Sequence, residues 1–359
     1  MPADRGGALR GLRRLSLALL AAGALLAAAG PALADPPPEL WDRARNGEVS
    51  AQYDLGIYYL KPGHPDHDLK SARYWLQEAA AAGSADAAAE LGILLLDQRE
   101  SPEDFSLALE ALTFAAENGV AKGQYRMGLL YASGLGVLTP DPRRARAMFQ
   151  LAASQGHAAS QANLGVYYYQ GIDGEQSRER AEELFRAAAD KGDALGQYHL
   201  GVLYLTDHYG EPDPQTGVAW ISKAVAQRLP QAQFALGQLY MQGRGVPKDA
   251  SEGLALVKRA AQSGFPEAQF QMGVWRAEGA GAPADQRAAV EWYSLAAEQG
   301  LPDAQYLLGN HLATGRGVEK NLESAMFWLE AAAKSGHPRA RERIEFYQQE
   351  AAAEGGKTE

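Results

Sequence analysis

The residues that could do chemistry in this sequence do not stand at the spacings that known reactions need. There is no cysteine, which excludes thiolate zinc sites and cysteine nucleophiles. No lysine follows a serine by three places, and the metalloprotease, nucleophile-elbow and phosphate-loop motifs are absent. Gly315-Arg316-Gly317 is spaced like a nucleotide loop, but it follows an expected helix, whereas a nucleotide loop follows a strand. We therefore expect no enzymatic activity and no cofactor.

One short segment gathers side chains that metals prefer. His64, Asp66, His67 and Asp68 lie in an expected turn and could reach a single ion. The alternative is a polar loop that caps the following helix, and we favour it because metal sites need a more defined ligand geometry. The remaining histidines fall in separate parts of the chain: His157, His199, His208, His311 and His337. We predict no metal site.

The elements that would position any site recur along the chain. A leucine or methionine followed by glycine returns every 36 residues, except for an interval of 37 between Gly128 and Gly165. The glycines of this first column are Gly56, Gly92, Gly128, Gly165, Gly201, Gly237, Gly273 and Gly309. A fixed period of this length is typical of a repeat architecture.

Each repeat reads as two helices, here called helix A and helix B. Helix A follows the pattern Gln-aromatic-x-Leu-Gly-x-x-Tyr, as in 197–204. Its glycine costs about 1 kcal/mol relative to alanine, so we expect a neighbouring helix that approaches too closely for a Cβ. Helix B ends in an alanine pair and a second glycine column that stops the helix, and only Arg228 breaks this column. We expect the glutamine column and the tryptophans Trp75, Trp220, Trp292 and Trp328 to serve packing.

The repeat resembles the Sel-like repeat, a relative of the tetratricopeptide repeat. The segments 232–240, 243–246 and 260–264 carry the resemblance most closely. It implies an all-α fold, a right-handed α-solenoid of about eight 36-residue helix-turn-helix units with terminal cap helices. The expected organisation is a signal peptide at 1–34, a spacer and cap helix at 35–47, repeats at 48–336, and a C-terminal cap helix with a frayed tail at 337–359.

The first residues read as an export signal. A basic segment ending at Arg14 precedes an apolar run from Leu15 to Ala29, and Ala32-Leu33-Ala34 is typical of a cleavage site. We expect cleavage after Ala34 and a periplasmic or secreted protein that does not span the membrane. The alternative is an uncleaved N-terminal anchor. The formal net charge of −10 argues against a nucleic-acid partner and against anionic lipid.

The columns that vary between repeats indicate where a partner would bind. On helix A they lie one residue before the leucine, two after it and five before it, and they share the face that lines the concave side of a solenoid. The predicted partner-binding residues are Asp54, Glu90, Arg126, Asn163, Tyr169, His199, Gln238, Gln271 and Asn310. Simple solvation of this face, or binding by the convex face, stays open.

These observations favour one function over two others. Members of the resembled family act as scaffolds, so the leading expectation is an adaptor that binds a protein partner in the cell envelope. A module that binds a glycan, either peptidoglycan or an exported polysaccharide, is the alternative. An enzyme is the third reading, and the missing motifs count against it.

Overall fold

The computed structural model shows helices joined by turns. It describes residues 36–61, 68–98, 101–135, 139–174, 176–206, 211–279 and 283–355. No strand occurs within these residues. The chain divides into two compact units, unit 1 ending at Gly196 and unit 2 beginning at Gln197. The expected signal peptide and the residues His64, Asp66 and His67 lie outside the described part of the chain.

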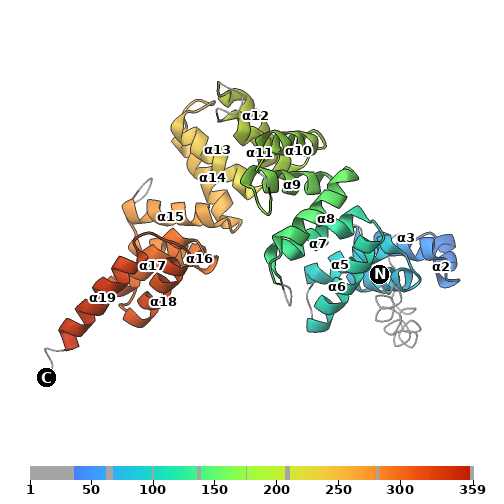
Figure 1. The fold of residues 1–359 in the computed structure, drawn as a ribbon, viewed down its shortest axis with the longest axis horizontal. Helices are drawn as coiled ribbons and strands as arrows, with labels where there is room; N and C mark the ends of the chain where they lie inside the picture. The colour runs from blue at the N-terminus through green and yellow to red at the C-terminus, as the bar shows by residue number, and fades with distance from the viewer. Residues whose placement is uncertain are drawn as a thin grey trace. The chain divides into compact units, whose positions relative to one another are not determined.

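Unit 1 contains a cap helix and four helix pairs (Figure 1). Its helices are α2 (Pro38–Arg45), α3 (Val49–Leu60), α4 (Leu69–Ala81), α5 (Ala85–Gln98), α6 (Pro102–Glu117), α7 (Ala121–Ser133), α8 (Pro142–Ser154), α9 (Ala158–Gln170) and α10 (Arg178–Asp190). Each odd-numbered helix is a helix A and packs against the helix B that follows it, and each B packs against the next A. The A helices α3, α5 and α7 also touch in series. This consecutive packing is that of an α-solenoid.

Unit 2 repeats the same arrangement and closes with a single helix. Its helices are α11 (Ala194–Tyr204, which begins in the last residues of unit 1), α12 (Pro214–Ala226), α13 (Pro230–Gln242), α14 (Ala250–Gln262), α15 (Pro266–Glu278), α16 (Gln286–Glu298), α17 (Pro302–Thr314), α18 (Leu322–Lys334) and α19 (Ala340–Gly355). The last of these packs on α18 where a further helix A would begin, as expected for a cap.

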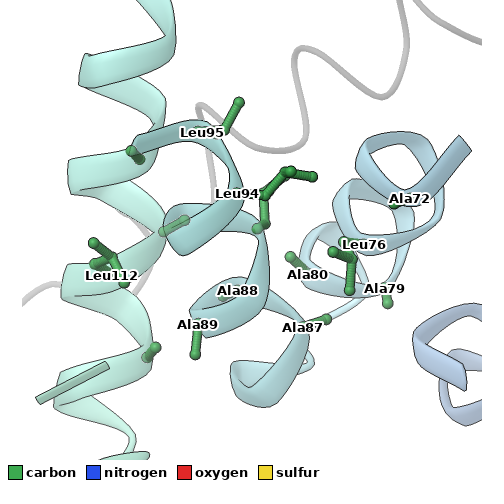
Figure 2. Packing of buried hydrophobic residues seen from close by; sticks show 14 of the residues in the cluster. Ala72, Leu76, Ala79, Ala80, Ala87, Ala88, Ala89, Leu94, Leu95 and Leu112 are labelled. Carbon is green, nitrogen blue, oxygen red and sulfur yellow. The ribbon is translucent and has the colours of Figure 1, made fainter. Parts of the chain in front are cut away.

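The glycine column of the A helices is where the helices of a pair come closest. A Cβ added to Gly92 of α5 would lie 2.5 Å from Cγ of Leu112. Figure 2 shows Leu76 and Leu112 on the two helices that flank α5. In unit 2, a Cβ on Gly201 would lie 2.8 Å from the carbonyl oxygen of Gly217. The expected close approach is therefore confirmed, and the mid-helix glycines are explained by packing.

The glutamine column forms hydrogen bonds between helices, as expected. Gln269 Nε2 donates to the carbonyl of Ala261 on the preceding helix B at 3.3 Å. Gln299, at the end of the following helix B, donates to Gln269 Oε1 at 2.7 Å. The same second bond joins Gln155 to Gln124 and Gln227 to Gln197. Where a shorter residue ends helix B, the buried Oε1 accepts no bond from the described residues, as in Gln52, Gln233 and Gln305.

The ends of helix B are fixed by short side chains and by left-handed backbone. A carboxylate, hydroxyl or amide side chain caps the N-terminus of each B helix from α4 to α18, at Asp68, Ser101, Asp141, Ser177, Asp213, Asp249, Asp285 and Asn321. The glycine column supplies positive φ after the C-terminus. Arg228 breaks that column in sequence but keeps its conformation, with a φ of 63°. The turn is therefore set by the packing of the repeats, since arginine disfavours it.

Two of the helix B tryptophans, Trp292 and Trp328, pack between repeats, as expected. Trp292 lies against a core that joins Val257 of the previous repeat to Met272 of its own repeat. Trp328 likewise lies against a core that joins Tyr293 of the previous repeat to Leu308 of its own repeat.

Candidate interaction surface

One face of each helix A is accessible to solvent, and the adjacent face is buried. The leucine or methionine before the first glycine column is buried in every repeat, from Leu55 to Leu308. The residue directly before it is partly or fully exposed in every repeat, from Asp54 to Leu307. The columns two after and five before the leucine are also accessible throughout. We call these three columns the inner-face columns, and all the predicted binding residues except Tyr169 stand on them.

In unit 1 the inner-face columns carry linked charges. Glu90 of α5 forms an ion pair with Lys122 of α7, so the pair bridges two successive A helices. Asp54 of α3 is exposed. Burial raises the pKa of Tyr53, and the charge of Glu90 acts in the same direction while Lys122 opposes it. The three A helices thus place carboxylates and an ammonium around one tyrosine.

A second group in unit 1 surrounds Tyr125 of α7. Its ring centroid lies 4.9 Å from that of His157 at the start of α9. Burial raises the pKa of Tyr125, while Arg126 and a hydrogen bond with Asn163 oppose the rise. Asn163 also donates to the carbonyl of Ala159 at 2.8 Å. The predicted residues Arg126 and Asn163 therefore meet at one tyrosine.

Tyr169 does not join that group by any described contact. Its ring centroid lies 6.5 Å from that of Phe185, the buried aromatic residue of α10. Its carbonyl accepts a hydrogen bond from Gln176 at 2.7 Å. The extra tyrosine after the repeat's usual one thus packs within its own helix pair, although it remains partly exposed.

In unit 2 the inner-face columns carry amides, an uncharged histidine and two carboxylates, Glu267 and Asp303, but no lysine or arginine. Burial lowers the pKa of His199 to about 4, so the ring is neutral at pH 7. Gln238 and Gln271 are partly exposed. Asn310 is held within the fold, because its Nδ2 donates to Tyr306 at 2.9 Å and its Oδ1 accepts from the Tyr347 hydroxyl of α19 at 3.2 Å.

Sequence reasoning did not single out three features of these surfaces. Lys122 and Tyr125 are central in unit 1, and the only signal was their place in an accessible column and in the aromatic column. In unit 2 a hollow of about 370 Å³ opens between α17 and α19. It is lined by Tyr306, Arg339, Glu342, Arg343 and Phe346. The two arginines stand four residues apart at the start of the cap helix, Arg339 just before it and Arg343 within it, which was the available signal.

The chemistry of these surfaces suits the binding of a polar partner. Within the described residues no group of three or more histidines, cysteines or carboxylates lies close enough to hold a metal ion. The same residues include no helix with both the length and the apolar character that crossing a bilayer requires. Ion pairs, amides and partly exposed rings remain, and these suit recognition of a polar partner.

The Sel1 repeat matches eight consecutive segments of the chain, 49–84, 85–120, 121–157, 158–193, 194–228, 230–265, 266–301 and 302–337. A Sel1 repeat protein from Oxalobacter formigenes shares 26% sequence identity, over 90% of this chain and 98% of that one, with a TM-score of 0.53. The protein c5321, described as a protective antigen of uropathogenic Escherichia coli strains with an SLR fold, shares 28% identity, over 88% and 68%, with a TM-score of 0.52.

Proposed function

Because the chain belongs to the Sel1 repeat family, we propose that it is an exported adaptor that binds a partner protein through the inner-face columns of its A helices. Sel1 repeat proteins generally mediate protein–protein interactions. The basic, apolar and small-residue pattern of residues 1–34 supports export to the periplasm or beyond. The fold is typically a scaffold without enzymatic activity, and we infer none here.

One observation carries this proposal. The columns that keep the stack together are the same in nearly every repeat and are buried, whereas the inner-face columns vary and remain accessible. A solenoid needs no particular side chain at an accessible position for its own stability. The variation is therefore available for recognising a partner.

The chemistry of the surface suggests the kind of segment that it binds. Unit 1 offers paired charges and partly exposed tyrosines, and unit 2 offers amides. Charged groups, tyrosine hydroxyls and amides all hydrogen-bond readily to a peptide backbone and to polar side chains. We infer a polar peptide segment of a protein in the cell envelope.

The test is crosslinking of the tagged mature chain in its native envelope, followed by mass spectrometry. The variant Arg126→Glu, Asn163→Ala, Gln271→Ala changes the inner-face columns. A matched control, Arg259→Glu, Gln150→Ala, Gln262→Ala, makes the same kinds of change at exposed positions of the B helices. A protein captured by wild type and control but lost by the variant supports the proposal. Equal capture by all three, or no enriched protein, contradicts it.

A glycan is the second candidate, and one observation favours it. In unit 2 an unbroken column of partly exposed rings, Tyr198, Phe234, Phe270 and Tyr306, stands beside the amides of the inner-face columns. Aromatic faces with nearby polar groups suit amphipathic ligands such as sugars. Binding of the pure protein to purified peptidoglycan, measured by sedimentation and lost in Gln238→Ala, Gln271→Ala, would support this candidate over a protein partner.

A further inference from the structure

Unit 1 carries two arginines that converge on one tyrosine. The guanidinium carbons of Arg146 on α8 and Arg180 on α10 lie 4.9 Å and 5.4 Å from the ring centroid of Tyr168 on α9. Arg146 also donates to the carbonyl of Asp173 at 2.6 Å, in the turn that follows α9. That bond fixes the guanidinium and leaves most of its five N–H donors available.

Arginines at the equivalent positions of other repeats in unit 1 have a carboxylate partner. Arg73, which stands where Arg146 stands but in the first repeat, pairs with Asp104 of the second repeat at 2.5 Å. Arg144, which stands where Arg180 stands but in the third repeat, pairs with Asp141 at 3.3 Å. In both pairs the carboxylate lies eight residues before the large apolar residue of its helix B.

In the fourth repeat that position is Ser177. Both Arg146 and Arg180 would find their carboxylate there by analogy with the earlier repeats, and a serine replaces it. Ser177 instead caps α10 by accepting from the Arg180 amide at 3.3 Å. Neither arginine forms an ion pair with a carboxylate among the described residues. The single change at 177 therefore leaves two guanidiniums facing one ring.

The surroundings strengthen the positive charge. Arg143, Arg144 and Arg178 are exposed at the starts of the same B helices. Among the described carboxylates of this region, Asp141 is paired with Arg144 and Glu179 accepts from the Ser177 hydroxyl at 3.2 Å. Hydrogen bonding to Arg146, and then to Arg180, lowers the pKa of Tyr168 despite the effect of burial, which places both cations close to its hydroxyl. A chain with a net charge of −10 thus concentrates cations at one edge.

We propose that Arg146, Arg180 and Tyr168 form a docking site for a carboxylate of an acidic peptide segment in a partner protein. Paired guanidiniums bind carboxylates in a bidentate fashion, and such bonds are among the strongest in proteins. The ring of Tyr168 holds both guanidiniums by cation–π contacts until the carboxylate binds. The site lies where the A helices end and the B helices begin, so it is separate from the inner-face columns.

The test measures the fluorescence anisotropy of a labelled hexaglutamate peptide with the full mature chain, and uses labelled hexaglutamine as the reference. We expect hexaglutamate to bind more tightly, and Arg146→Gln or Arg180→Gln to weaken it about tenfold each. Arg180→Lys keeps the charge but loses the planar guanidinium, so its affinity for hexaglutamate should lie between that of wild type and that of Arg180→Gln. Arg186→Gln is the matched control, because that arginine of α10 pairs with Glu182.

The sharpest variant is Ser177→Asp. It restores the internal carboxylate and keeps a good N-cap for α10, so the protein should fold at least as stably while hexaglutamate binding falls about tenfold. Equal weakening by Arg186→Gln and Arg180→Gln would overturn the proposal, as would Ser177→Asp binding as tightly as wild type. So would a site that binds inorganic phosphate, depends on both arginines and ignores hexaglutamate.

Discussion

Units 1 and 2 share one fold and one set of buried columns, but their inner-face columns differ in chemistry. Unit 1 places charges there, with Glu90 and Lys122 joined across successive A helices. Unit 2 places amides and the neutral His199 in the columns next to the leucine. Its column five before the leucine keeps the carboxylates Glu267 and Asp303, but no lysine or arginine stands in these columns to pair with them. The comparison teaches that the solenoid fixes where a side chain stands and leaves its chemical type free.

The aromatic column shows the same freedom. In unit 2 every repeat has a ring there, whereas unit 1 alternates rings with alanine, as in Tyr53, Ala89, Tyr125 and Ala162. Rings in this column contact the last residue of their own repeat, just before the next helix A or the cap helix, as Tyr125 does with His157 and Tyr306 with His337, whose centroids are 4.1 Å apart. An alanine removes that contact without disturbing the helix.

The largest expected effect concerns how closely the paired helices approach. At Gly201 of unit 2 an added Cβ would meet backbone, the Gly217 carbonyl at 2.8 Å, whereas at Gly56 of unit 1 it would meet the side chain of Leu76 at 2.6 Å. Backbone cannot move aside cheaply, so Gly201→Ala should destabilise by about 2–3 kcal/mol even though alanine favours helix by about 1 kcal/mol. Gly56→Ala should lower the free energy of unfolding less, since the nearest atoms belong to a side chain, which shifts more cheaply than backbone. Urea unfolding measures both, and equal losses would refute the distinction.

His199 gives unit 2 a pH dependence that its unit 1 counterpart, Asn163, cannot give. The unfolded chain protonates this histidine near 6.5, but the folded one only near 4, so the unfolded state binds more protons between these values. Stability should therefore fall as the pH is lowered from about 6.5 to 4, by about 2 kcal/mol at pH 4.5. His199→Asn should reduce this loss. Unfolding free energies at pH 7 and pH 4.5 would test it, and an unchanged difference would contradict the assignment.

The smallest effect concerns the hydrogen bonds of the glutamine column. Two variants exchange glutamine and serine at the residue that ends helix B, one in each unit. Gln155 of unit 1 donates to Gln124 at 2.8 Å, so Gln155→Ser should destabilise by about 1 kcal/mol. In unit 2, Ser263 ends the helix after Gln233, whose buried Oε1 accepts no bond from the described residues. Ser263→Gln should stabilise by somewhat less than 1 kcal/mol, because the longer side chain loses rotamer freedom. Thermal denaturation of the two variants should show shifts of opposite sign.

Much of the fold was predictable because it depends on repetition. The first glycine column predicted a close helix approach, and Gly92 against Leu112 confirms it. The second column predicted the end of each helix B, and even Arg228 obeys it with a positive φ. Regular spacing predicts such features because every repeat meets the same neighbours. The role of the predicted partner-binding residues stays a prediction.

The sequence by itself determined the period, the helix pairs, the buried columns and the accessible face, since each follows from positions that recur in every unit. Only the tertiary structure decided which accessible side chains meet. It pairs Glu90 with Lys122, ties Asn310 to Tyr347 of the cap helix, and brings Arg146 and Arg180 to Tyr168. Each of these contacts joins side chains that stand on different helices. Their partners depend on the distance and angle between packed helices, which a list of spacings does not contain.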